Sequence, residues 1–154
     1  MTIGHLRKPI VATERRERHP TRGIAVPSAD TLERFVAMVE SNAHAEAIEA
    51  FYAPHASMRE NGGMPRVGRD ALVANERRVI AKAKRVHSEC VRPVFVHGDH
   101  VVVRWRFRFD WVDGTVTRME ELACQRWEGE RIAEETFFYD PAQLRPCDAA
   151  DIVE

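Results

Sequence analysis

The sequence predicts an α+β fold in which three helices come first and an antiparallel meander of strands follows. Apolar residues recur at helical spacing as far as about residue 84, and from about residue 86 they alternate with polar residues, the period of two that strands require. Turns that contain glycine separate the strands at Gly98, Gly114 and Gly129. Helices grouped before strands, instead of alternating with them, are typical of the α+β class.

The length and composition indicate one globular domain. The chain has 154 residues, 44% of them apolar and 31% charged, which suits a single core. The net charge of −1 gives no electrostatic reason to expect a nucleic acid or a membrane as partner, and no stretch has the long uncharged apolar run of a membrane helix. Three cysteines without CxxC spacing indicate a reducing, cytoplasmic location.

We expect three parts along the chain: an N-terminal arm over residues 1–27, a folded domain over 28–141 and a C-terminal tail over 142–154. The arm carries six lysines and arginines against two glutamates, a local charge of +4. We interpret it as a flexible, solvated tail. The alternative, a basic arm that binds an anionic partner, lacks the interleaved aromatic residues of such segments.

The helices and a first short strand are expected before residue 85. Asp30 is predicted to cap the first helix, at the capping-box spacing from Glu33. Pro54 ends a second, short helix, a strand covers residues 56–61, and the third helix covers residues 70–84. The apolar positions expected to face the core are Leu32, Phe35, Val36 and Val39 in the first helix, Ala45, Ile48, Phe51 and Tyr52 in the second, and Leu72, Val73, Val79, Ile80 and Ala83 in the third.

The stretch His100–Trp111, HVVVRWRFRFDW, is expected to be the central strand of the sheet. It alternates strictly, so its charged residues share one face and its aromatic residues share the other. The neighbouring strands are predicted over residues 86–97, 115–128 and 132–139. The charged face comprises Arg104, Arg106, Arg108 and Asp110, and the aromatic face comprises Trp105, Phe107, Phe109 and Trp111.

The register of the hairpins decides which other residues join these two faces. Asp113-Gly114 is a strong signal for a two-residue turn. With that turn Arg106 lies opposite Glu121, so Glu121 joins the charged face and Cys124 joins the aromatic one. A three-residue turn over residues 128–130 is expected to place alternate residues of the last strand in the interior, and these are Glu135, Phe137 and Tyr139.

Three segments, FYAPHASMREN, VGRDAL and WEGERIAEETFFYD, together with this order of elements, resemble the nuclear transport factor 2-like superfamily. That group includes SnoaL-like polyketide cyclases, ketosteroid isomerases and limonene epoxide hydrolases. The resemblance covers roughly residues 30–141. It implies a cone-shaped α+β barrel, in which three N-terminal helices pack in a strongly curved antiparallel sheet. Because the superfamily hosts many chemistries, the resemblance is specific for the fold and not for an activity.

Two members of the superfamily suggest candidate site residues. Glu60 stands where a ketosteroid isomerase has its aspartate base, but Phe35 and Ala123 replace the two residues that hold the enolate oxygen, so steroid isomerisation by that route is not expected. Arg108 and Asp110 match the Arg-x-Asp of limonene epoxide hydrolases. The water-positioning asparagine of those hydrolases lies near Asn61, and their last-strand aspartate is replaced by Phe137, for which Glu135 is the candidate substitute.

Composition and resemblance differ on which face of the central strand lies inside. Composition favours the aromatic face as the core, since burial of each large aromatic side chain contributes roughly 1.5–3 kcal/mol. The resemblance implies instead that the Arg-x-Asp face lines a cavity between sheet and helices, and that the outer sheet face meets a second subunit. We therefore expect a homodimer through the aromatic sheet face, with Trp105, Phe107 and Phe109 in the interface.

The sequence thus predicts a small-molecule enzyme, an isomerase, cyclase or hydrolase that uses acid–base chemistry without a cofactor on a hydrophobic ligand with a polar or anionic group. No metal is expected, because the histidines form no HExxH or other ligand spacing. The alternatives are a non-catalytic ligand-binding or dimerisation module of the same fold and, for Arg108 and Asp110, a structural ion pair. The predicted catalytic residues are Arg108, Asp110, Glu60 and Glu135, and the predicted substrate-binding residues are Asn61, Glu121, Phe137 and Tyr139.

Overall fold

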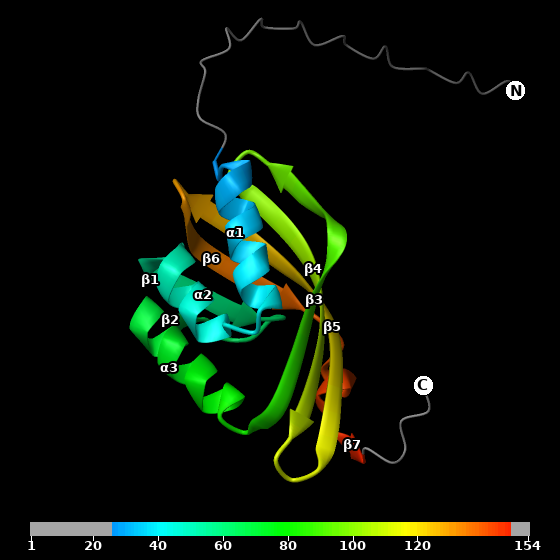
Figure 1. The fold of residues 1–154 in the computed structure, drawn as a ribbon. Helices are drawn as coiled ribbons and strands as arrows, with labels where there is room; N and C mark the ends of the chain where they lie inside the picture. The colour runs from blue at the N-terminus through cyan, green and yellow to red at the C-terminus, as the bar shows by residue number, and fades with distance from the viewer. Residues whose placement is uncertain (1–25, 149–154) are drawn as a thin grey trace, which may run out of the picture.

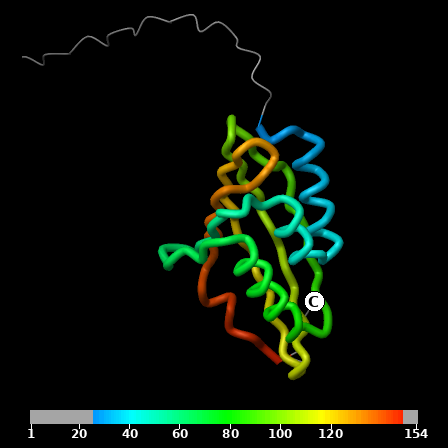
Figure 2. The backbone as a smooth tube through the Cα atoms, turned by 90° about the vertical axis from the view of Figure 1, so that its left-hand side faces the viewer, coloured from blue at the N-terminus to red at the C-terminus, as the bar shows by residue number. Residues whose placement is uncertain are grey.

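The computed structural model describes residues 26–148, so almost all of the predicted arm lies outside the described residues. Figure 1 shows the helices on one side of a long curved sheet, and Figure 2 shows the same arrangement from the side of α3. The helices are α1 (Ala29–Glu40), α2 (His44–Phe51) and α3 (Arg69–Ile80), with a short 3-10 helix η1 (Pro141–Leu144), and the strands are β1 (Tyr52–Glu60), β2 (Arg66–Val67), β3 (Ala83–His97), β4 (His100–Trp111), β5 (Thr115–Glu128), β6 (Arg131–Phe138) and β7 (Cys147–Asp148).

The sheet is curled but not closed into a barrel. Its strands follow the order β2-β1-β6-β5-β4-β3, and β7 pairs with β5 beside that path. Neighbouring strands are antiparallel except β1 and β6, which are parallel, so the sheet is mixed. The sequence predicted antiparallel pairing throughout, because the short first strand carries no local signal that it pairs with β6, on the far side of α3 in the chain.

The helix boundaries differ from the predicted ones in three places. Ser28, not Asp30, caps α1, because the Ser28 hydroxyl oxygen accepts a hydrogen bond from the Thr31 amide at 3.2 Å while Asp30 lies inside the helix. Helix α2 ends at Phe51, so Tyr52 and Pro54, predicted at its end, lie in β1. Helix α3 ends at Ile80, earlier than predicted, because the chain already pairs with β4 from Ala83 onward. None of these differences changes the order of the elements.

The β4–β5 hairpin has a register one residue away from the predicted one. Asp110 pairs with Val116, so the connection contains residues 112–114, and Gly114 takes the positive φ of 89° that such a three-residue loop uses. A shift of one residue moves every side chain of a strand to the other face. Relative to β4 the faces of β5 are therefore exchanged: Glu121 lies with the aromatic residues of β4, and Cys124, opposite Val102, lies with the charged ones.

The aromatic face of β4 is the inner face of the sheet. Trp105 is 2% exposed, pairs with Glu121 and contacts Phe35 of α1 edge-on, with ring centroids 6.4 Å apart. The prediction that the charged face looks inward is therefore wrong. The predicted dimer interface is also wrong, since Trp105, Phe107 and Phe109 lie between the sheet and the helices. Burial of these rings contributes more than burial of the arginines, which keep their hydration on the outer face.

The β5–β6 hairpin differs from the prediction twice, and the two differences cancel. Glu128 pairs with Arg131, so the turn has two residues instead of three, but a bulge at Ala133 inserts one residue into β6. Gln125 consequently pairs with Glu135. The alternate residues of β6 face the interior, as predicted.

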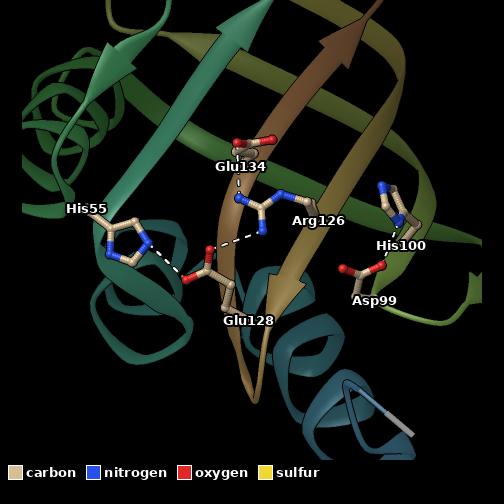
Figure 3. Close-up of polar contacts among 6 residues, drawn as sticks. All are labelled: His55, Asp99, His100, Arg126, Glu128 and Glu134. Atoms are coloured by element: carbon tan, nitrogen blue, oxygen red, sulfur yellow. Dashed lines mark hydrogen bonds and ion pairs between the residues drawn. The ribbon is translucent and has the colours of Figure 1, made fainter.

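The outer face of the sheet carries a row of ion pairs. Arg126 on β5 bonds Glu128 and Glu134 at 3.0 Å each, and Glu128 also bonds His55 on β1, again at 3.0 Å (Figure 3). Exposed pairs of this kind each contribute about 0–1 kcal/mol to folding. The stability of the fold therefore depends mainly on the inner face.

Candidate active site

A cavity of about 330 Å³ lies between the inner face of the sheet and the helices. Its wall receives side chains from α1, α2 and α3 and from strands β1, β4, β5 and β6. The volume is at the small end of the range for ligand sites, roughly 300–1,000 Å³. A wider groove of about 810 Å³ runs over the outside of α1 and α2, but its charged residues are all exposed.

Strand β4 gives the cavity an apolar wall. The ring centroids of Trp105 and Phe107 are 5.8 Å apart, those of Phe107 and Phe109 are 6.0 Å apart, and those of Phe109 and Trp111 are 5.1 Å apart. The rings therefore form a continuous strip along the strand. Such a wall lowers the local dielectric and strengthens the electrostatic effect of any charged group beside it.

Glu135 is held at the base of the cavity by two donors. The Tyr52 hydroxyl donates to one carboxyl oxygen of Glu135, and the Gln125 amide nitrogen donates to the other at 2.7 Å. Gln125 in turn accepts a hydrogen bond from the Trp127 indole at 3.0 Å, which fixes the orientation of its amide. Burial raises the pKa of Glu135 to about 7, and the two donated hydrogen bonds oppose part of that rise.

Glu121 faces the same cavity from β5 but has no such donors. It is 8% exposed, and among residues 26–148 its carboxyl accepts no hydrogen bond and forms no ion pair. Burial raises the pKa of Glu121 to about 8, with a further contribution from the negative charges of Glu135, Glu60 and Glu76. The structure thus places two buried carboxyls in one small cavity, one with donors and one without.

The mouth of the cavity carries a second polar group of residues. The Tyr139 hydroxyl donates to Glu60 at 2.7 Å, and Arg66 on β2 donates to the other carboxyl oxygen of Glu60 at 3.4 Å. Burial raises the pKa of the Tyr139 hydroxyl, and the hydrogen bond to Glu60 adds to this effect. The Glu60 side chain is 47% exposed, so a ligand that enters the cavity meets it first.

His44 connects three elements at the opposite side of the cavity. One ring nitrogen lies 3.1 Å from a carboxyl oxygen of Glu76 on α3, and the other lies 2.7 Å from the Ser88 hydroxyl on β3. Ser88 donates to the Asn42 side chain at 2.9 Å, so it accepts from His44. This order resembles a Ser-His-acid relay, but Ser88 does not line the cavity and its hydroxyl hydrogen is already used.

Most of the predicted site residues meet at this cavity, and three do not. Arg108 and Asp110 lie on the outer face, 2.8 Å apart, in a separate depression of about 390 Å³ with Arg85 and His87, which corrects the prediction that they face the cavity. Asn61 also lies outside the lining, and its side-chain oxygen accepts the Tyr139 amide at 3.1 Å, which holds the end of β1 against the segment after β6. The predicted residues that line the cavity are Glu60, Glu121, Glu135, Phe137 and Tyr139.

Sequence reasoning missed three residues that define the site. Tyr52 was assigned to the apolar stripe of a helix and Gln125 to the charged sheet face, whereas both hold Glu135. His44 was one of several scattered histidines. A useful signal for Tyr52 was available, because a buried tyrosine normally needs a partner for its hydroxyl.

The part of the chain that the structure describes contains no cluster of three or more His, Cys, Asp or Glu side chains arranged to hold a metal ion. Within the same residues, each helix is too short or too polar to cross a bilayer.

Comparisons with known proteins agree on the fold. A family model described as a SnoaL-like domain matches residues 32–135. The chain is similar to a protein of ketosteroid isomerase-like fold from Catenulispora acidiphila, solved in complex with trimethylamine, at 17% identity over 82% of this chain and 98% of that one, with a TM-score of 0.65. It is also similar to a candidate SnoaL-like polyketide cyclase from Mesorhizobium loti (22% identity, coverage 72% and 97%, TM-score 0.61) and to an LEH-like epoxide hydrolase from M. tuberculosis (14% identity, coverage 75% and 84%, TM-score 0.60). At these identities the likeness shows the fold alone, and no curated protein matches the chain.

Proposed function

The chain belongs to the SnoaL-like domain family, and from that premise we propose that it is an enzyme that acts on a small hydrophobic molecule by acid–base chemistry, without a cofactor. The observation that carries this proposal is the position of Glu121. It is a buried carboxyl without a hydrogen-bond partner among the described residues, and it faces an apolar cavity beside a second buried carboxyl, Glu135. Buried acids with raised pKa values in a cavity are typical of sites that transfer protons.

The two carboxyls have different surroundings, which favours different roles. Glu135 accepts hydrogen bonds from two donors that stabilise its ionised form, so it is suited to act as the base. Glu121 has no donor and the higher pKa, about 8, so it keeps its proton at neutral pH and is suited to act as the acid. A substrate bound between them loses a proton to Glu135 and receives one from Glu121, the exchange on which isomerisation, ring closure and ring opening depend.

The rest of the lining supports a small, mostly apolar substrate. The aromatic strip of β4 provides the surface for its hydrophobic body, and the Glu60–Tyr139 pair at the mouth can meet a polar substituent. The relative from Catenulispora acidiphila was solved with trimethylamine, which supports a ligand of modest size in this chain as well.

The proposal can be tested without knowledge of the natural substrate, because proton transfer at carbon is measurable on model compounds. We expect the protein in D2O to accelerate hydrogen–deuterium exchange at the α-carbon of a hydrophobic ketone such as 2-tetralone, followed by NMR. Glu121→Gln and Glu135→Gln should each lower that acceleration by about 10²-fold or more. Glu120→Gln and Glu134→Gln are the matched controls, because they alter the adjacent outward-facing glutamates, and they should leave it unchanged.

Two other outcomes would change the assignment. Binding of 2-tetralone without any exchange above the buffer rate would favour the alternative function, a non-catalytic ligand-binding module of the same fold. If the exchange rate is unchanged in Glu121→Gln but lost in Asp110→Asn, proton transfer would be assigned to the Arg108–Asp110 pair on the outer face.

A further inference from the structure

The carboxyl of Glu121 lacks a partner that the fold could easily have provided. A carboxyl removed from water normally gains donors from its surroundings, as Glu135 does from Tyr52 and Gln125. Glu121 is less enclosed than Glu135, at 8% against 3% exposed, and its carboxyl is open to the cavity, where it has no donor from any described residue. We therefore expect a ligand in the cavity to supply the hydrogen-bond donor for the Glu121 carboxyl.

The charges around Glu121 define what kind of donor this is. The carboxylates that act on it come from three other elements: Glu135 on β6, Glu60 on β1 and Glu76 on α3. The two basic groups in the lining are already engaged, since Arg66 bonds Glu60 and His44 bonds Glu76. When Glu135 and Glu121 are ionised, the four carboxylates outnumber the two basic groups, and this excess of negative charge disfavours an anion and favours a cation.

The aromatic strip of β4 strengthens the same preference. Trp105 lies directly opposite Glu121 across the β4–β5 ladder, and Phe107, Phe109 and Trp111 continue from it along the cavity. The face of an aromatic ring attracts a cation within about 6 Å of its centroid, most strongly for tryptophan. A hydrophobic amine would place its carbon skeleton on this strip and its ammonium group next to Glu121.

We propose that the ligand of this cavity is a small hydrophobic amine, bound as its ammonium ion, with the Glu121 carboxylate as its partner. This inference rests on the proposed function, because it names a ligand class of the same site. The amine is a ligand that competes with the substrate, since it ionises the carboxyl that acts as the acid. Binding is balanced as follows: the neutral Glu121 carboxyl and the free ammonium ion form a carboxylate–ammonium pair, and the carboxyl proton leaves to the solvent. The amine keeps all its protons.

The release of a proton makes the affinity depend on pH in a defined direction. Because the pKa of Glu121 is raised to about 8, only a small fraction of the free protein has this carboxyl ionised at pH 6. The affinity for an ammonium ion should therefore rise about 50-fold between pH 6 and pH 8. It should fall again only above about pH 10, where a simple amine loses its own proton.

Isothermal titration calorimetry on the full chain tests this with 2-phenylethylamine and its neutral isostere 2-phenylethanol at pH 6, 7 and 8. We expect the amine to bind more tightly than the alcohol at pH 8 and to show the 50-fold rise. Binding should release close to one proton at pH 6 and about half a proton at pH 8, measured in buffers of different ionisation enthalpy. Glu121→Gln should weaken amine binding at pH 8 and leave at most the roughly tenfold rise that Glu135 can supply. The matched control, Glu120→Gln, should behave as the wild type.

Three results would overturn the inference: no amine binding at any pH, an alcohol affinity equal to or greater than that of the amine at pH 8, or an unchanged 50-fold rise in Glu121→Gln. Circular dichroism and the melting temperature of Glu121→Gln serve as the control that its fold is intact.

The amine-binding test is separate from the test of the proposed function. If 2-tetralone exchanges its protons but 2-phenylethylamine does not bind, the enzyme proposal stands and the amine proposal fails. If the amine binds as expected but no ketone exchanges, the reverse holds.

Discussion

The hydroxyl of Tyr52, the first residue of β1, donates a hydrogen bond to the carboxyl of Glu135 on β6, 83 residues later in the chain. Both residues are 3% exposed. The parallel pairing of β1 with β6 brings the two elements side by side, which is the one parallel contact of the described sheet. The bond orients one of the two cavity carboxyls and joins β1, the strand that follows α2, to its neighbour β6 in the interior of the sheet.

Tyr52→Phe is expected to raise the pKa of Glu135 above its value of about 7, because a donated hydrogen bond stabilises the ionised carboxylate and the phenyl ring cannot donate. The variant should also be about 1–3 kcal/mol less stable at neutral pH, since a buried acceptor loses its donor. Carboxyl 13C NMR measures the pKa, and urea unfolding measures the stability.

Tyr139→Phe is the control for that substitution. It removes the same hydroxyl from a hydrogen bond to Glu60, whose side chain is 47% exposed and can bond to water instead. A loss of stability as large as that of Tyr52→Phe would mean that burial of the Tyr52–Glu135 bond is unimportant.

Glu121→Gln is expected to make the protein more stable at pH 8 while it lowers the rate of proton exchange. The folded-state pKa of Glu121, about 8, is higher than the unfolded value of 4.5, so the stability that its neutral form contributes is complete below about pH 4.5 and is lost as the pH rises through 8. Between pH 5 and pH 8 the wild type should lose on the order of 3 kcal/mol more than the variant. Urea midpoints at pH 5, 6, 7 and 8 measure the difference.

The exposed glutamates do not contribute to the loss of stability between pH 5 and pH 8. Ion pairs with Arg126 lower the pKa of Glu128 and Glu134, so their contribution is present above about pH 4.5 and is lost as the pH falls through their folded-state values. For Glu120→Gln, the plot of stability against pH should therefore run parallel to that of the wild type above pH 5. A parallel curve for Glu121→Gln as well would show that Glu121 is solvated.

The strands could be predicted from sequence, but the inner face of the sheet could not. The bounds of β4 and β5 coincide with the predicted ones, because alternation and glycine turns are local signals. Composition favours the aromatic face as the core, whereas the likeness of Arg108 and Asp110 to limonene epoxide hydrolases implies the charged face, and no local signal decides between them. The structure agrees with composition. The three-residue loop 112–114, in place of the predicted two-residue turn, sets only the pairing, so that Trp105 instead of Arg106 lies opposite Glu121.

Only part of the candidate site could be predicted from the sequence. Glu135 was predicted on the interior face, although the turn and the bulge at Ala133 each differ from expectation by one residue. The donors that hold it were not predicted, because Tyr52 reaches Glu135 only through a parallel strand pair and Gln125 only through the bulge in β6. Contacts between strands distant in the chain carry no periodicity that a single sequence displays.

Phe107→Ala tests the corrected face directly. Phe107 packs between Trp105 and Phe109 and against the ring of His44, 5.5 Å between centroids, so its removal should destabilise the fold by about 2–4 kcal/mol. The molecular mass by light scattering should not change, because the ring is not in a subunit interface. Arg106→Ala, the neighbour on the outer face, should alter stability by less than about 1 kcal/mol. If the molecular mass halves in Phe107→Ala while the melting temperature is unchanged, the aromatic face would after all be a dimer interface.

The two buried carboxyls together predict a bell-shaped pH dependence of kcat/KM for ketone proton exchange. The rate should rise as Glu135 ionises near pH 7 and fall as Glu121 loses its proton near pH 8, so the optimum lies between these values. Any residual rate of Glu121→Gln should lack the alkaline fall, because glutamine does not titrate. Glu120→Gln and Glu134→Gln should keep both limbs, since these residues face outward on the same two strands. A series of quenched reactions from pH 5.5 to 9.5 distinguishes these profiles, and an alkaline fall that persists in Glu121→Gln would assign the acid to another group.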